Sequence, residues 1–472
     1  MTPSSLVKQI TTYFPFEPTV EQTEALNRLS TYLLTGDDTD VFLLKGYAGT
    51  GKTSLISALI RYLQANQLDC VLMAPTGRAA KVLSSYSGHP AFTIHKTIYR
   101  KASGENGSFG LNWNRHRNAV FIVDEASMIA NEAGENAQFG SGHLLEDLLE
   151  FVFLGDHCRL ILMGDTAQLP PVGQVLSPAL DPDRLRALGM EAQGIELTQV
   201  LRQAGDSGIL RNATDLRDAI RFDEVKRFPR LKVNKVDVIR LAGDELSDVL
   251  SASYDKVGPE ESKVICVSNK RAVLFNKGIR ASVLYKEDEL TTGDSLLVGR
   301  NNYLWSDPYP EIPFIANGDL VEVVRVRKHY EMYGFRFADV DVRFPDYDWE
   351  LEVRVLLDAL EAEAPALDGP RQERLYQAVL EDYAPAHTSK RTLYQALRKD
   401  PWLNALQIKY GYAFTCHKAQ GGQWKHVFID QGYVTEDRLG LDYYRWLYTA
   451  LTRATERVYL VNFNDECLDL AD

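Results

Sequence analysis

The sequence predicts an α/β protein built from two α/β domains, each interrupted by a small β-rich insert. Near both ends of the chain, short apolar runs that stop at polar or Gly-rich turns alternate with helical patterns, which is typical of parallel sheets covered by helices. Between about 293 and 405 the rhythm changes to alternating apolar and polar residues, as in antiparallel strands with one buried face. A chain of 472 residues also exceeds what one hydrophobic core accommodates.

The first α/β domain is expected over residues 1–200. Its strands are predicted from four apolar runs: VFLLKG (41–46), CVLMAPTG (70–77), AVFIVDEAS (119–127) and RLILMGD (159–165). Residues 99–117 are polar and rich in Gly and Asn, and their central GENG is a turn signal. We therefore expect a β-hairpin inserted at 97–118.

The second α/β domain is expected over residues 201–472. Its strand candidates are KVICVSN (263–269), VFID (427–430) and VYLVNF (458–463). An insert of about 320–405 contains alternating segments at 319–327, 335–344 and 349–357, followed by helical patterns at 371–383 and 389–400. This pattern indicates a small β-barrel-like module with helices attached.

Composition excludes several classes of protein. The chain is 45% hydrophobic and 25% charged, which is ordinary for a globular protein, and no run of about 18 apolar residues could span a membrane. The N-terminal residues show no secretion signal. Five scattered cysteines without a CxxC pair indicate reduced thiols, so we expect a cytoplasmic location. The net charge of −13 argues against a protein that coats nucleic acid, but not against a narrow basic channel.

GYAGTGKT at 46–53 is a complete phosphate-binding loop, placed after an apolar run and before a helical pattern. Gly49, Thr50 and Gly51 are expected to bring backbone N–H groups to the phosphates of a nucleotide. Lys52 is expected to reach the β- and γ-phosphates, and the hydroxyl of Thr53 to hold Mg²⁺. The sequence therefore predicts binding of ATP with Mg²⁺.

Two further strand ends predict the rest of a hydrolytic site. Asp124 and Glu125 close the third apolar run, where Asp124 would bind Mg²⁺ and Glu125 would activate the attacking water. Such a pair is often only a solvated strand end, and the phosphate-binding loop upstream is what favours the catalytic interpretation. Gln168 follows the next run and would sense the γ-phosphate, although a Pro-containing turn alone could explain it.

The chain resembles the superfamily 1 helicases, and within them the Dda/RecD-like branch of superfamily 1B. The resemblance rests on nine motifs in the family's order: VEQTEAL, GYAGTGKT, APTGRAAKVL, TIHK, VDEASM, GDTAQLPPV, LTQVLRQ, YAFTCHKAQG and LYTALTRA. It implies two RecA-like P-loop domains facing a cleft, a hairpin that acts as a pin and an SH3-like barrel. The segment 130–143 is longer than we expect at that point of the family's pattern.

The resemblance also implies roles for residues that composition and spacing leave open. Gln22 is similar to the residue that reads adenine, and Gly421 to a position whose backbone approaches the phosphates. Arg202 and Arg453 are similar to two arginines that reach the γ-phosphate from the second domain and act as catalytic residues.

Contacts to a nucleic-acid backbone are expected from both domains. Thr76 and Arg78 precede and open a helical pattern, so they and its amides are suited to bind phosphates. Together with the residues that the resemblance implies, the predicted DNA-binding set is Pro75, Thr76, Arg78, Thr93, His95, Thr415, His417 and Lys418. Thr415, His417 and Lys418 are alternatively part of a switch linked to ATP. Aromatic platforms for bases are also expected, with core packing as the alternative for each candidate: Phe92, Tyr99, Phe109, Trp113 and Trp424.

These observations predict an ATP-dependent DNA helicase that moves along single-stranded DNA, with 5′-to-3′ travel implied by the resemblance. Its partners would be single-stranded DNA and duplex DNA with a single-stranded tail, and we expect a monomer. A role in DNA repair or recombination is compatible with this. The alternatives are an RNA-directed motor, a nucleotide-switched strand-binding protein that does not unwind, and a P-loop ATPase that acts on a protein.

Overall fold

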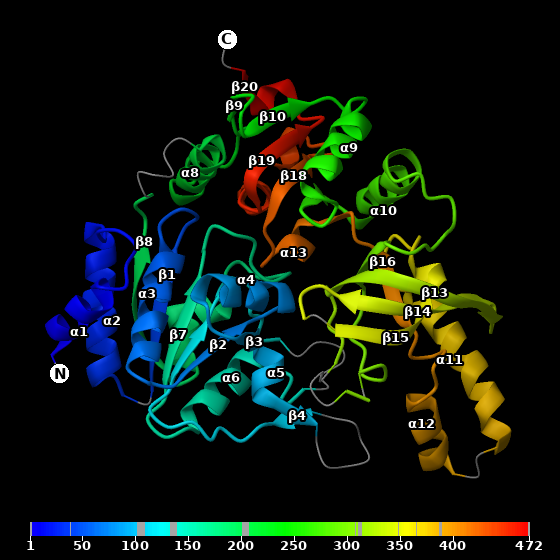
Figure 1. The fold of residues 1–472 in the computed structure, drawn as a ribbon, viewed down its shortest axis with the longest axis horizontal. Helices are drawn as coiled ribbons and strands as arrows, with labels where there is room; N and C mark the ends of the chain where they lie inside the picture. The colour runs from blue at the N-terminus through cyan, green and yellow to red at the C-terminus, as the bar shows by residue number, and fades with distance from the viewer. Residues whose placement is uncertain are drawn as a thin grey trace.

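A sheet of six parallel strands forms the first domain (Figure 1). The computed structural model describes residues 2–37, 39–101, 109–132, 139–200, 207–306, 308–309, 314–347, 349–364, 366–386 and 389–470. In spatial order the strands are β3 (Ala91–Thr93), β2 (Cys70–Ala74), β6 (Val120–Val123), β7 (Arg159–Gly164), β1 (Asp40–Gly46) and β8 (Glu191–Leu197). The four apolar runs of the sequence are its central strands, since both of their faces are buried.

Helices cover this sheet and fix its phosphate-binding edge. They are α1 (Pro3–Thr11), α2 (Val20–Thr35), α3 (Lys52–Ala65), α4 (Gly77–Ser87), α5 (Ile94–Ile98), α6 (Leu144–Phe153) and α7 (Pro182–Ala187). Helix α3 follows β1 after the phosphate-binding loop, and α4 follows β2 after a short connection. The polar residues at these junctions therefore meet at the carboxyl edge of the sheet, where ligands bind in open α/β folds.

The second domain contains a five-stranded parallel sheet. Its strands, in spatial order, are β10 (Val238–Leu241), β19 (Ala454–Val461), β18 (Trp424–Asp430), β11 (Ser262–Cys266) and β17 (Ala413–Thr415). Its helices are α8 (Gly208–Arg221), α9 (Leu246–Val257), α10 (Asn269–Gly278), α13 (Cys416–Ala419) and α14 (Leu441–Leu451). A short parallel pair, β9 (Leu231–Val233) and β20 (Leu468–Leu470), lies beside it. The expectation of two α/β domains is confirmed.

A closed five-stranded barrel interrupts the second domain. Its strands are β12 (Ser295–Val298), β13 (Leu320–Met332), β14 (Phe335–Phe344), β15 (Trp349–Leu356) and β16 (Leu406–Tyr410), and the helices α11 (Gly369–Tyr383) and α12 (Lys390–Arg398) lie between β15 and β16. The barrel therefore begins before residue 320 and ends after residue 405, outside the expected segment. The first and last strands are short and apolar, so the sequence does not distinguish them from strands of the α/β sheet. The other boundaries, at residues 200 and 201, stay predictions.

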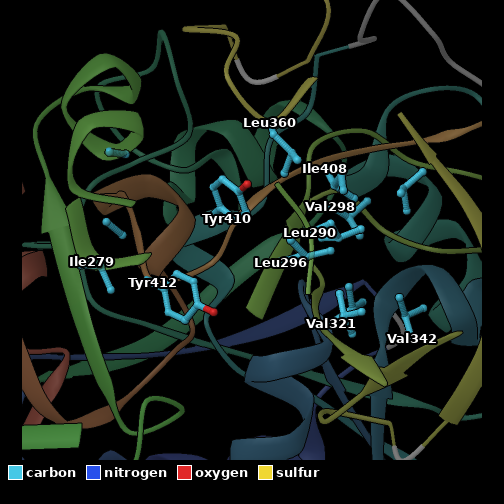
Figure 2. Packing of buried hydrophobic residues seen from close by; sticks show 14 of the residues in the cluster. Ile279, Leu290, Leu296, Val298, Val321, Val342, Leu360, Ile408, Tyr410 and Tyr412 are labelled. Carbon is cyan, nitrogen blue, oxygen red and sulfur yellow. The ribbon is translucent and has the colours of Figure 1, made fainter. Parts of the chain in front are cut away.

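The barrel and the second α/β domain share one hydrophobic core. Val264 and Phe428 of the parallel sheet belong to the same buried cluster as Val298, Val340 and Ile408 of the barrel. Figure 2 shows part of this cluster, with Tyr410 and Tyr412 between the barrel residues and Ile279. Because close-packed interiors resist shear, the barrel is expected to move with the second domain as one body.

The expected hairpin is present at its base. Strands β4 (Tyr99–Lys101) and β5 (Phe109–Leu111) pair antiparallel, and the GENG turn lies outside the described residues. All five cysteines are free and buried. Among the described residues, no helix has the length and apolar character needed to cross a membrane.

Candidate nucleotide and strand sites

A cleft of about 850 Å³ lies between the two α/β domains. The first domain contributes the phosphate-binding loop, the ends of β6 and β7 and one face of α4, and the second domain contributes the segments around Gly421 and Arg453. The predicted site residues that line it are Gly49, Gly51, Lys52, Thr53, Asp124, Glu125, Gln168, Gly421 and Arg453. Residues from five separate motifs are thus brought together.

The loop that precedes α3 has the backbone needed to surround phosphates. Gly49 and Gly51 have φ angles of 77° and 83°, which favour glycine. Gly51 is the N-cap of α3, and no side chain caps the helix there. The first N–H groups of α3 therefore point towards the cleft without a side-chain acceptor, as in an anion-binding helix terminus. The Nζ of Lys52 donates to the carbonyl oxygens of Gly46 and Tyr47, so its ammonium lies over this loop.

The two carboxylates at the end of β6 differ in environment. The backbone N–H of Glu125 donates to Oδ1 of Asp124 at 2.8 Å, and the hydroxyl of Tyr86 donates to Oδ2 at 2.7 Å. Glu125 has a φ angle of 52°, a strained backbone that turns its side chain into the cleft. Burial raises the pKa of Glu125, while the guanidinium of Arg453 opposes that rise. A carboxylate with a raised pKa is suited to accept a proton from water.

Arg453 reaches this carboxylate from the second domain. Its Nη1 lies 3.8 Å from Oε1 of Glu125, and only 2% of the residue is exposed. Within its own domain Arg453 donates to the carbonyl oxygens of Thr449 and Gly422 at 3.1 and 3.2 Å. These bonds within the second domain fix the position of the Arg453 guanidinium. Arg202, the other expected arginine, lies outside the described residues.

The loop after β7 also contacts the second domain. Oε1 of Gln168 is buried and has no hydrogen-bond partner, so this side chain retains an acceptor in the cleft. The neighbouring Leu169 accepts a bond from Nε2 of Gln420 at 2.6 Å, and its N–H donates to Oγ1 of Thr449 at 2.9 Å. These bonds connect the loop that carries Gln168 to the second domain.

Tyr448 forms a second bridge that sequence reasoning missed. Its hydroxyl donates to Oδ2 of Asp165 at 2.6 Å and accepts from the N–H of Ala48 at 2.9 Å. Ala48 belongs to the phosphate-binding loop, whereas Tyr448 lies on α14 of the second domain. The two partners are 400 positions apart in sequence, so only the fold reveals the contact.

Two predicted nucleotide-binding residues do not line the cleft. Gln22 is fully buried, accepts from the N–H of Thr19 as part of a capping box, and donates to the carbonyl of Thr50 at 3.4 Å. The hydroxyl of Thr50 bonds to the carbonyl of Tyr47 at 2.8 Å. Both side chains thus support the phosphate-binding loop from within, and their contact with a nucleotide stays a prediction.

A second cavity, of about 220 Å³, runs between the first domain, the second domain and the barrel. Every predicted DNA-binding residue lines it except Thr415. Thr415 instead lines a small cavity of about 30 Å³ that shares Lys418 with the first. We call the larger cavity the strand channel.

The cations in the strand channel differ in their suitability for phosphate. Arg78 stacks on Trp424, with 4.3 Å from its Cζ to the ring centroid, and its buried Nε has no hydrogen-bond partner. Burial lowers the pKa of Lys418 to about 8 and that of His95 to about 4. At neutral pH His95 is therefore an uncharged donor or acceptor and cannot supply positive charge, which limits the role expected for it.

The turn between β14 and β15 closes one side of the strand channel. A Cβ at Gly77 would lie 1.8 Å from the hydroxyl oxygen of Tyr347, so only glycine fits at the start of α4. The same hydroxyl donates to Oδ1 of Asp319 at 3.2 Å, and Lys81 donates to the carbonyl of Pro345 at 2.5 Å. This contact between barrel and first domain was not predicted from the sequence, because neither segment belongs to a motif that identifies its partner.

Aromatic rings join the hairpin to the second domain. Phe139 packs against Phe109 of β5 at 4.7 Å between centroids and against Phe314 at 4.9 Å. Tyr303 lies 5.5 Å from Phe109, and His95 lies 5.0 Å from Phe139. The end of the long 130–143 segment therefore braces the base of the hairpin.

Of the five aromatic residues considered as base platforms, Tyr99, Phe109 and Trp424 are buried core residues. Phe92 and Trp113 remain exposed, at 44% and 68%.

The donor set in the nucleotide cleft fits Mg²⁺. Thr53 and Asp124 offer a hydroxyl and a carboxylate oxygen, and Mg²⁺ is commonly held by one or two such groups together with phosphates. Within the described parts of the chain, no cluster of three or more His, Cys, Asp or Glu side chains could hold a metal without a nucleotide.

The fold and the two sites define a P-loop protein in which two RecA-like domains face a nucleotide cleft. Residues 18–228 match the family described as "AAA domain", and residues 410–461 match the "UvrD-like helicase C-terminal domain". The chain is 25% identical to the ATP-dependent RecD2 DNA helicase of Deinococcus radiodurans over 93% of its own length, and spans about half (48%) of that relative. It is 26% identical to the ATP-dependent DNA helicase dda of Enterobacteria phage T4, covering 82% of this chain and 86% of the relative. A solved structure of the Pif1 helicase from Bacteroides with ADP-AlF3 and single-stranded DNA aligns over 97% of this chain and 95% of that chain, at 15% identity and a TM-score of 0.46.

The C-terminal part of the chain therefore matches a helicase domain, and the chain over most of its length is similar to the RecD2 and Dda DNA helicases. The resemblance drawn from the nine motifs is thereby confirmed.

Proposed function

We propose that this protein is an ATP-dependent DNA helicase that moves 5′ to 3′ along single-stranded DNA. The observation that carries the proposal is that the same two domains form both the nucleotide cleft and the strand channel. Arg453 of the second domain reaches Glu125 of the first, while α4 of the first domain and the barrel enclose the channel. Closure of the cleft therefore changes the channel, which is what movement along a strand requires.

In the nucleotide cleft, the loop around Gly49 and Gly51 and the ammonium of Lys52 hold the phosphates of ATP. Thr53 and Asp124 would hold Mg²⁺, which would neutralise charge on the phosphates. Glu125 orients and deprotonates the attacking water, because its carboxylate lies at the cleft and has a raised pKa.

Gln168, Arg453 and Arg202 complete the proposed catalytic set. Gln168 retains a buried acceptor and shares its loop with the interdomain bonds of Leu169. Arg453 stabilises charge on the γ-phosphoryl group when the domains close, as arginine fingers do. The backbone of Gly421 forms part of the wall of the nucleotide cleft. Gln22 supports the phosphate-binding loop from within.

The strand lies in the channel with its phosphates on residues of both domains. Thr76 caps α4 and Arg78 has an unpartnered Nε, so both are placed for phosphate contacts on the first domain. His417 and Lys418 supply contacts from the second. Contacts to phosphate carry no sequence information, which suits a motor that must pass over any sequence.

An RNA-directed motor is the second candidate, because contacts to phosphates do not distinguish the two sugars.

The hairpin base, braced by Phe139, acts as the pin that separates the duplex. We further infer that the protein works as a monomer in the cytoplasm, in keeping with five buried, unoxidised cysteines.

ATP hydrolysis measured with and without single-stranded DNA tests the proposal. The assay compares the wild type with Lys52→Ala and with Lys8→Ala, an exposed lysine on α1 as the matched control. We expect strong stimulation by DNA in the wild type and in Lys8→Ala, and none in Lys52→Ala. An RNA strand of the same sequence and duplexes with 5′ or 3′ tails then test substrate and direction. Hydrolysis that no nucleic acid stimulates would refute the motor.

A further inference from the structure

Helix α4 belongs to both sites at once. Its N-cap and first turn, Thr76 to Arg78, line the strand channel. One face of the same helix, which includes Ala79, Val82 and Tyr86, lines the nucleotide cleft. With 11 residues, α4 spans roughly 16 Å, so it connects the two sites directly.

At the far end of α4, Tyr86 bonds to the carboxylate expected to hold Mg²⁺. Its hydroxyl donates to Oδ2 of Asp124 at 2.7 Å, while Oδ1 accepts from the N–H of Glu125 at 2.8 Å. Each oxygen of Asp124 thus already has a donor within the protein.

The first turn of α4 is held on its sheet by small side chains. Ala79 and Ala80 pack against Ala74 and Ala91, in a cluster that contains no larger residue. Contacts between methyl groups bury little apolar area, so a small shift of this turn costs little free energy.

The second domain contacts the same first turn of α4. A Cβ at Gly421 would lie 2.9 Å from Cβ of Ala79 and 3.0 Å from Oγ1 of Thr76. In addition, Arg78 donates to the carbonyl of Gln423 at 3.2 Å. A strand in the channel and closure of the cleft therefore both act on the N-terminal end of α4.

We propose that Tyr86 is a positioning residue that restrains Asp124 in the absence of a strand, and that a strand bound at the first turn of α4 releases this restraint. A helix transmits a displacement from one end to the other because its backbone bonds keep it stiff. The proposal rests on the proposed function, since it explains how a strand would stimulate ATP hydrolysis. It assigns to Tyr86 a role that no motif of the sequence suggested.

The test is Tyr86→Phe, which removes the hydroxyl and keeps the ring. The Mg²⁺ concentration at half-maximal binding of a fluorescent ADP is measured with and without oligo(dT), next to strand-dependent ATP hydrolysis. In the wild type we expect oligo(dT) to lower this midpoint about tenfold, the lower end of what a hydrogen bond to a carboxylate contributes. In Tyr86→Phe the midpoint without oligo(dT) should already equal the strand-bound value, and the strand-free rate of hydrolysis should rise. Tyr394→Phe, on the exposed face of α12, is the control and should behave as the wild type.

Two results would overturn the proposal. In the first, the Mg²⁺ midpoint of Tyr86→Phe without oligo(dT) equals that of the wild type without oligo(dT). In the second, the substitution changes the midpoint by the same factor in the presence and in the absence of oligo(dT). Equal thermal unfolding midpoints exclude a folding defect as the cause. If strands do not stimulate hydrolysis in the wild type, the proposed function fails. If they stimulate it but leave the Mg²⁺ midpoint unchanged, only the coupling through Tyr86 fails.

Discussion

Replacing Tyr448 by phenylalanine removes one hydroxyl from the interface between the two α/β domains. That hydroxyl donates to the carboxylate of Asp165 and accepts from the N–H of Ala48 in the phosphate-binding loop. Asp165 keeps its bond from the N–H of Ala167 at 2.9 Å, so it does not lose every partner. The substitution therefore tests the bridge between the domains with little other disturbance.

The expected loss follows from these contacts. A hydrogen bond to a charged group contributes about 1.5–3 kcal/mol, and an N–H left without an acceptor adds to the cost. Taking about 2 kcal/mol for the closed arrangement, kcat/KM for ATP should fall roughly 30-fold. The fall is expected because, in the proposed function, ATP hydrolysis depends on the approach of Arg453 to Glu125 across the cleft, and the bond of Tyr448 stabilises that arrangement.

The assay is steady-state ATP hydrolysis at saturating single-stranded DNA, with kcat and KM determined separately. Tyr444→Phe is the matched control, because Tyr444 lies on the same helix but donates to the carbonyl of Arg227, within its own domain. We expect Tyr444→Phe to keep the wild-type kcat/KM. A value for Tyr448→Phe within about twofold of the wild type would show that the bridge does not contribute to closure.

Three further predictions concern the strand channel and the hairpin. Burial raises the pKa of Asp319 to about 7, so its carboxylate becomes charged as pH rises through 7 and then repels phosphate. The affinity of the wild type for a strand should therefore fall over pH 6–8, and Asp319→Asn should flatten that fall. Fluorescence anisotropy at each pH measures the affinity, and an equally steep fall in Asp319→Asn would refute the prediction. Gly77→Ala should lower the free energy of unfolding by about 1–3 kcal/mol through overlap with Tyr347, and the same change should cost little in a chain that already carries Tyr347→Ala. An unchanged unfolding midpoint for Gly77→Ala alone would contradict the contact. Phe139→Ala should reduce unwinding of tailed duplexes while strand-stimulated hydrolysis persists, and a parallel loss of both would argue against a role confined to the hairpin.

The local sequence was sufficient to predict those parts of the site that lie directly at the end of one strand. Gly49, Gly51 and Lys52 lie in a single loop, and Asp124 directly follows the apolar run that forms β6. Because parallel strands end at a common edge, their convergence could be predicted without knowing the fold.

What the sequence could not predict depends on contacts between distant segments. Tyr448 meets Ala48 across 400 positions, and Tyr347 meets Gly77 through a turn of the barrel that no motif marks. Tyr86 lies on the helix that follows a predicted strand, but the direction of its side chain depends on how α4 packs. The burial that leaves the imidazole of His95 uncharged at neutral pH is likewise a property of the fold, and the contact of His95 with a nucleic-acid backbone stays a prediction.

The continuous core between the barrel and the second domain links the two sites mechanically. Because the two share buried residues such as Val264 and Val340, a rotation that brings Arg453 towards Glu125 also moves the turn that carries Tyr347. That turn contacts α4 at Gly77, the same turn against which Gly421 packs. Cleft closure therefore changes both walls of the strand channel in a single movement. A variant that loosens the barrel from the second domain should hydrolyse ATP without advancing along the strand.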